Sequence, residues 1–135
     1  MLRFLCFRLR LKNTYYIVDL GIRSYLEGYR NTDSGRALEN IVYLQLLFDG
    51  WEITVGKLRA GEIDFVATKD EQTVYIQVTD DMRDEATRER ELKSLRTVKS
   101  AFPKVVIVRS GDYPTDYDGI RVIKLVDFLL HNKEL

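Results

Sequence analysis

Three strand-like segments follow one another along residues 51–80, and the short connections between them restrict the fold more than any other feature. The connections at 59–61 and 70–72 have the length of hairpin loops. The three strands should therefore form an antiparallel meander within a central sheet. The segments are WEITVGK (51–57), EIDFVATK (62–69) and TVYIQVTD (73–80).

A strongly apolar helical segment, RALENIVYLQLLFD, precedes this meander. Asp33 or Ser34 can cap its N-terminus, and Gly50 is placed as its C-terminal stop. Its apolar stripe widens almost all round, which predicts a largely buried helix. The stripe comprises Leu38, Ile41, Val42, Leu44, Gln45, Leu46, Leu47 and Phe48.

A second helix is predicted after the meander. It opens near Asp84, and Pro103 ends it. Its charged residues suggest an outer helix with i,i+4 pairs such as Glu89–Lys93. The predicted buried stripe comprises Leu92, Leu95, Val98 and Phe102.

The rest of the chain predicts a strand, a loop, a strand and a helix. VVIVRS (105–110) is a continuous apolar run, typical of a strand that is covered on both faces. A loop at 111–119 leads to IRVIKL (120–125) and then to a terminal helix, VDFLLHN. The predicted fold is an α/β domain with a mixed central sheet flanked by helices, in the order α-β-β-β-α-β plus an extra strand and helix.

The first residues predict an opening strand with one wet face, because Phe7, Leu9 and Leu11 alternate with arginine and lysine. The arginines interrupt the apolar run, so it resembles neither a signal peptide nor a membrane span. Asp19 can cap a short helix that runs to Leu26. We therefore expect a cytoplasmic protein without a membrane partner.

Composition excludes several kinds of site. Lys plus Arg equals Asp plus Glu at 21 each, so nucleic-acid binding is not indicated by net charge, although a local basic patch stays open. A single cysteine, Cys6, excludes an internal disulfide and a cysteine-based zinc cage. His131 is the only histidine and lies near the C-terminus, so we expect neither a histidine-based triad nor an HExxH metal site. No GxxxxGK[ST] loop is present, so the chain has no ATP site.

Three polar side chains fall where burial is expected. Glu39 interrupts the apolar helix, Asp64 lies within the second strand, and Gln77 lies within the third. The period of two places Gln77 and Thr79 on the same face of their strand. A buried carboxylate is unfavourable unless it is paired, hydrogen-bonded or bound to a metal. One reading is that these groups are hydrogen-bonded within the fold, and the other is that they form a site.

This arrangement resembles the PD-(D/E)xK nuclease superfamily, in which a core helix carries Glu and a meander carries Asp followed by (D/E)-x-K. Glu39 matches the helix acid and Asp64 the first strand acid. Gln77, thirteen residues after Asp64, falls where the second acid belongs, and Thr79 falls where the lysine belongs.

The wider sequence is similar to the nuclease-like C-terminal domain of unknown function found in prokaryotic AAA+ family ATPases. The resemblance covers roughly residues 15–130 and implies a restriction-endonuclease-like domain at 15–135, with 1–14 as a remnant strand of an upstream region. The strings that carry it are YYIVDLGIRSYLEGYR, ALENIVYLQLL, VGKLRAGEIDFVA and YIQV.

The resemblance also implies a chemistry. In active members, two acids hold Mg²⁺ or Mn²⁺, the metal activates water, and the lysine adds a second positive charge. Gln77 lacks the negative charge and Thr79 lacks the positive one, while Lys57 is the candidate for a displaced lysine. We therefore expect a catalytically impaired domain that serves as an interaction or regulatory module.

Two alternatives stay open. One is a Mg²⁺-dependent nuclease that hydrolyses DNA or RNA phosphodiesters, with Asp64 and Gln77 on the metal and Glu39 assisting. The other is a nucleic-acid binder without cleavage, for which a basic face is expected. An unpaired edge on the opening strand would favour a protein partner or a homodimer. The residues of the basic face would be Arg23, Arg30, Arg36, Lys57 and Arg59.

Overall fold

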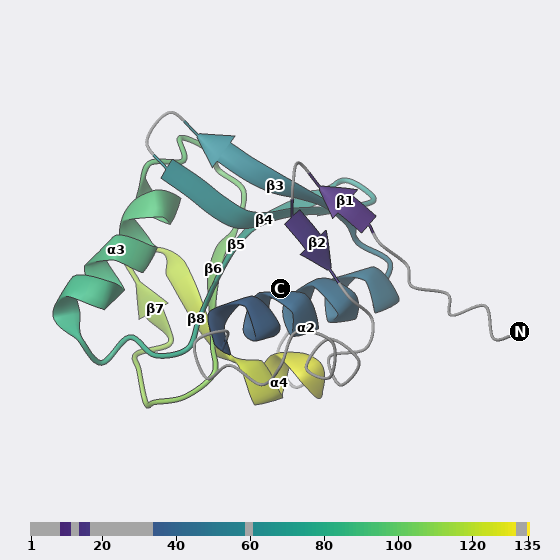
Figure 1. Cartoon of the computed structure of the whole chain (residues 1–135). Helices are drawn as coiled ribbons and strands as arrows, with labels where there is room; N and C mark the ends of the chain where they lie inside the picture. The colour runs from purple at the N-terminus through teal and green to yellow at the C-terminus, as the bar shows by residue number, and fades with distance from the viewer. Residues whose placement is uncertain (1–8, 12–13, 17–33, 59–60, 132–134) are drawn as a thin grey trace, which may run out of the picture.

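The computed structural model describes residues 9–11, 14–16, 34–58, 61–131 and 135. In these residues a six-stranded mixed sheet is combined with three helices (Figure 1). The helices are α2 (Ser34–Phe48), α3 (Glu85–Arg96) and α4 (Leu125–Leu129). The strands of the sheet are β3 (Glu52–Leu58), β4 (Gly61–Lys69), β5 (Gln72–Thr79), β6 (Lys104–Val108), β7 (Asp116–Tyr117) and β8 (Ile120–Lys124).

The predicted α/β fold and its order of elements are confirmed. Strands β3, β4 and β5 form the antiparallel meander, and β6 and β8 continue the sheet in parallel with β5. The prediction of a loop at 111–119 was incomplete, because this segment contains the short edge strand β7. The spatial order is β3-β4-β5-β6-β8-β7.

A separate pair of short strands, β1 (Leu9–Leu11) and β2 (Thr14–Tyr16), lies near the N-terminus. The described part of the predicted opening strand is thus confirmed as extended backbone. Residues 1–8 and the predicted helix from Asp19 to Leu26 lie outside the described residues. None of the helices in the described ranges has the length and apolarity needed to cross a membrane.

The sheet is covered on both faces. On β6, Val105 and Ile107 pack in a cluster with α2 and α4, whereas Val106 and Val108 pack in a second cluster with α3. All four are fully buried, which confirms the predicted two-sided strand. Figure 1 shows α3 on the opposite side of the sheet from α2 and α4.

Helix α2 is buried through its middle and exposed at its ends. Leu38, Val42 and Leu46 contact the sheet, but Phe48 is 84% exposed. The prediction of a largely buried helix is therefore confirmed for residues 37–46, all of which are buried or partly buried, while the exposed residues lie at the two ends of the helix. Its predicted stop is confirmed, since Gly50 adopts φ 83°, a left-handed conformation that glycine accepts without strain.

Helix α3 begins as predicted and ends early. The Asp84 carboxylate caps it by accepting a hydrogen bond from the Thr87 N–H at 2.8 Å. The helix ends at Arg96, well before Pro103, and Phe102 is 48% exposed rather than buried.

Hydrogen bonds from outside the helix ladder explain this early end. Thr97 Oγ1 donates to the Ser94 carbonyl at 2.7 Å, and Lys104 Nζ donates to the Val98 carbonyl at 2.8 Å. These donors satisfy carbonyls that a longer helix would have used internally. Lys104 opens β6, so the second bond links the chain after α3 directly to that strand.

Gly56 permits the close approach of β3 and β4 beside an irregularity in their register. A Cβ at Gly56 would lie 3.1 Å from Ile63 Cβ and 3.2 Å from Val66 Cγ2. We expect Gly56→Ala to lower the free energy of unfolding by about 1–3 kcal/mol, because such overpacking forces neighbours apart. Urea unfolding measures the change. Gly35→Ala is the matched control, since nothing lies within 4 Å of its Cβ, and an equal loss in both variants would contradict the packing explanation.

Candidate functional site

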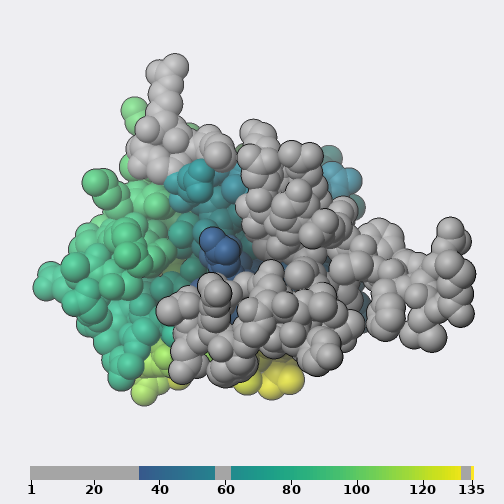
Figure 2. Space-filling model, viewed as in Figure 1, coloured from purple at the N-terminus to yellow at the C-terminus, as the bar shows by residue number. Residues whose placement is uncertain are grey.

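The candidate site lies where β4 and β5 separate. Their backbone ladder ends at the pair Phe65–Ile76. Beyond it, β4 continues against β3 through Ile63, and β5 continues against β6 through Gln77. In the space-filling view, blue atoms of α2 reach the surface next to teal atoms of the meander (Figure 2).

Side chains replace the backbone bonds at this separation. Asp64 Oδ2 accepts a hydrogen bond from the Val78 N–H at 2.8 Å. Gln77 Oε1 accepts a longer one, at 3.4 Å, from the Asp64 N–H. Two predicted site residues therefore satisfy backbone donors that the separating strands leave without ladder partners.

Gln77 also links the sheet to α3. Its Nε2 donates to Glu91 Oε2 at 3.1 Å, and both side chains are buried. Val74, Ile76 and Val78 pack on the α2 side of β5, so Gln77 and Thr79 lie on the α3 side, as the period of two predicts. Arg90 donates to the other oxygen of Glu91, Oε1, at 2.8 Å.

Glu91 is the site residue that the sequence prediction missed. The helix 85–96 was expected to be an outer, charged helix, yet Glu91 is only 8% exposed. Its position carried a signal: Glu91 precedes Leu95 by four residues and Val98 by seven, which places it on the buried stripe. The expected pair Glu89–Lys93 was wrong, since Glu89 pairs with Arg96 at 2.8 Å.

The site is strongly acidic. The pKa of Asp64 is raised from 3.8 to about 7, chiefly by burial. The negative charges of Glu39 and Glu91 contribute to this shift, and the Val78 hydrogen bond opposes it. Burial also raises the pKa of Glu39, with Arg36 opposing and Glu91 adding to the shift. The structure thus brings Glu39, Asp64 and Glu91 within electrostatic reach of one another.

Among the other predicted residues that the structure describes, Arg36 acts on Glu39 as a positive charge, whereas Thr79 carries none. Thr79 is buried and its hydroxyl donates to the Asp81 carbonyl at 3.3 Å. Lys57 lies on β3 opposite Glu62 in register, and its side chain is outside the described atoms. Of the predicted basic face, Arg36 is exposed on α2, while Arg23, Arg30 and Arg59 lie outside the described residues.

Within the part of the chain that the structure describes, the residues are not grouped as the oxygen cage that the resemblance implies for Mg²⁺. Throughout the described ranges, no three His, Cys, Asp or Glu side chains are grouped so that they could hold a metal ion. Asp64 Oδ2 and Gln77 Oε1 already accept backbone hydrogen bonds. Each of these two oxygens therefore already has one partner within the fold, whereas Mg²⁺ requires several oxygen ligands grouped around it.

Comparison with known proteins identifies a relative of the chain. No family model matches the chain. Over 122 residues, or 90% of its length, the chain is 36% identical to an uncharacterised protein of Haemophilus influenzae. It spans only 30% of the length of that relative. The chain is therefore a distant homologue, over most of its length, of an uncharacterised bacterial protein.

Proposed function

We propose that this chain is a catalytically impaired nuclease-like domain, restriction-endonuclease-like in architecture, which serves as an interaction or regulatory module of a prokaryotic ATPase-family protein. One observation carries the proposal. The Gln77 amide, at the position of the second acid, accepts from the Asp64 N–H and donates to Glu91 Oε2. An ionised glutamate could not donate to Glu91, so this part of the site is built around a neutral amide.

The charges around Asp64 also support impairment. Phosphodiester hydrolysis needs positive charge that stabilises the phosphate as negative charge develops on it. Here the ionisable groups that raise the pKa of Asp64 are acids, namely Glu39, Glu62 and Glu91. A phosphate that approached Asp64 would therefore meet negative charge, which opposes both cleavage and phosphate-based binding.

A role as a module within a longer protein has separate support. The element order matches the core that the resemblance implies, and the bacterial relative is much longer than this chain. Because that relative is uncharacterised, it contributes no activity or substrate to the proposal.

Calorimetric titration of Mn²⁺ and Mg²⁺ into the wild-type protein and Asp64→Ala tests the impaired site. We expect no saturable binding at millimolar metal in either protein. Asp112→Ala is the matched control, because Asp112 is an exposed aspartate that pairs with Lys124. Saturable binding by the wild type and by Asp112→Ala that Asp64→Ala loses would overturn the proposal in favour of a metal-dependent nuclease and would justify a cleavage screen.

A nucleic-acid titration addresses the remaining alternative. We expect single- and double-stranded DNA and RNA to bind weakly or not at all at physiological salt. Tight binding that falls steeply with salt, without cleavage, would instead support a non-cleaving binder that contacts phosphates.

A further inference from the structure

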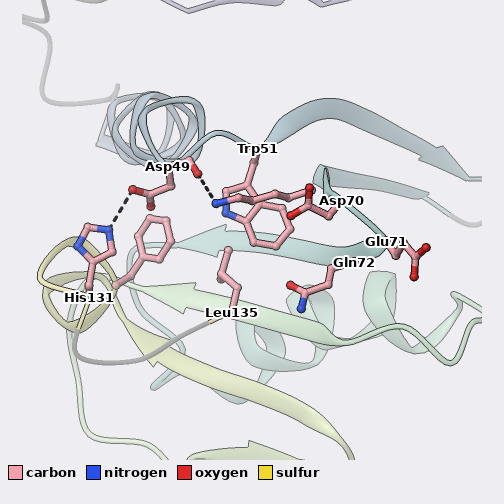
Figure 3. A pocket seen from close by; sticks show the side chains of 9 residues that line it. Asp49, Trp51, Asp70, Glu71, Gln72, His131 and Leu135 are labelled. Carbon is pink, nitrogen blue, oxygen red and sulfur yellow. Dashed lines mark hydrogen bonds and ion pairs between the residues drawn. The ribbon is translucent and has the colours of Figure 1, made fainter.

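A pocket of about 1060 Å³ lies between the C-terminal ends of α2 and α4 and the turn that joins β4 to β5 (Figure 3). Its size is that of a small-molecule or side-chain binding site. Its lining combines the aromatic rings of Trp51 and Phe128 with several charged groups. None of its lining residues takes part in the hydrogen bonds around Asp64, so the pocket is separate from the candidate site.

Several polar groups of this pocket already have partners within the fold. His131 Nε2 lies 3.0 Å from Asp49 Oδ1, which also accepts a hydrogen bond from Gln45 Nε2 at 3.0 Å. Lys69 Nζ donates to the Asp49 carbonyl at 2.7 Å, just after the C-terminus of α2, where the helix dipole favours a cation. Figure 3 shows the facing Asp49 and His131 at the left of the pocket.

The acidic turn at the other side of the pocket is different. Asp70 and Glu71 are exposed, and neither forms an ion pair or a side-chain hydrogen bond with any residue in the described part of the chain. Asp70 adopts φ 53°, a left-handed conformation that glycine would accept more easily. In Figure 3, Trp51 lies between the Asp49–His131 pair and these two acids.

We propose that this pocket binds the guanidinium group of a basic ligand. The cation would contact the indole of Trp51, which attracts positive charge through its ring face, and would pair with Asp70 and Glu71. An anionic ligand is disfavoured, because the lining carries three acids, Asp49, Asp70 and Glu71, against the single lysine Lys69.

The test uses Trp51 as its own reporter, because it is the only tryptophan in the chain. L-argininamide is titrated into the full chain while the indole emission and, in parallel, the heat of binding are recorded. Citrullinamide is the matched ligand control, since its ureido group has the same shape and no charge. We expect saturable binding of argininamide and roughly tenfold weaker binding of citrullinamide.

Two aspartates in similar backbone conformations provide matched variants. Asp70→Asn removes the charge while keeping a residue that tolerates the left-handed conformation, and it should weaken argininamide binding several-fold. Asp118→Asn makes the same change at φ 54° in the turn before β8, away from the pocket, and should leave binding unchanged. Circular dichroism checks that both variants are folded.

Three results would overturn the proposal. They are no saturable response to argininamide by either method, equal binding of citrullinamide, and unchanged affinity in folded Asp70→Asn. Inorganic phosphate is titrated as well, and binding of phosphate without argininamide would assign the pocket to anions instead. Where argininamide does bind, comparison with an acetyl-Gly-Arg-Gly amide peptide identifies the source: tighter binding of the peptide indicates a partner polypeptide, and tighter binding of argininamide indicates a free small molecule.

Discussion

The wild-type protein is expected to become less stable as the pH rises from about 4 to about 7, and the Asp64→Asn variant is expected not to show this decrease. The pKa of Asp64 is raised from 3.8 to about 7, chiefly by burial, so the folded protein holds this proton more tightly than the unfolded chain does. This difference in proton affinity stabilises the folded state fully at pH values below the pKa of Asp64 in the unfolded chain. The stabilisation is lost as the pH rises through the pKa of Asp64 in the folded protein. The resulting change in the free energy of unfolding has an upper limit of about 4 kcal/mol.

Urea unfolding across this pH range, in parallel on both proteins, measures the difference in slope. The asparagine side chain keeps an oxygen that can accept from the Val78 N–H, so the hydrogen bond at 2.8 Å need not be lost. Near pH 7, Asp64→Asn should therefore be more stable than the wild type, whereas the two should converge near pH 4. Asp112→Asn, at an exposed aspartate, should retain the wild-type slope. Parallel curves for wild type and Asp64→Asn would mean that Asp64 is not held protonated by its surroundings.

The elements of the fold were predictable where their cause is local. The alternation of strands 52–58, 61–69 and 72–79, with hairpin-length connections, led directly to the meander. The early end of α3 was not predictable, because the bond from Lys104 to the Val98 carbonyl joins two elements. Strand β7 has only two residues and is defined by its pairing with β8, so no periodic pattern in the sequence could predict it.

The residues of the candidate site were likewise predictable only in part. Asp64 and Gln77 stood out because each interrupts an apolar strand, and the structure joins them through the Asp64 N–H. Glu91 did not stand out, since acids are common on charged helices, and its burial depends on how α3 packs against β5. The pocket beside Trp51 was equally hidden, because its lining comes from segments far apart along the chain.

The proposal for the impaired site makes its strongest prediction at Gln77. Gln77→Glu should lower the free energy of unfolding at neutral pH by about 2–4 kcal/mol, because the donor to Glu91 is lost and two carboxylates are forced together in a buried place. Lowering the pH should reverse much of the loss, since one shared proton restores a hydrogen bond between the two carboxyl groups. Thermal unfolding from pH 4 to pH 8 follows both effects.

Gln77→Met separates charge from the loss of hydrogen bonding. It is similar in size and removes both bonds of the amide, which leaves Asp64 N–H and Glu91 Oε2 without this partner, but it introduces no charge. It should be destabilised without recovery at low pH. Mn²⁺ also distinguishes the two variants, because only Gln77→Glu restores the second acid of the nuclease motif. Mn²⁺ should therefore raise the melting temperature of Gln77→Glu more than that of the wild type. If Gln77→Glu were instead as stable as the wild type at neutral pH and indifferent to Mn²⁺, the neutral amide would not be what organises Glu91, and the impaired-site proposal would lose its main support.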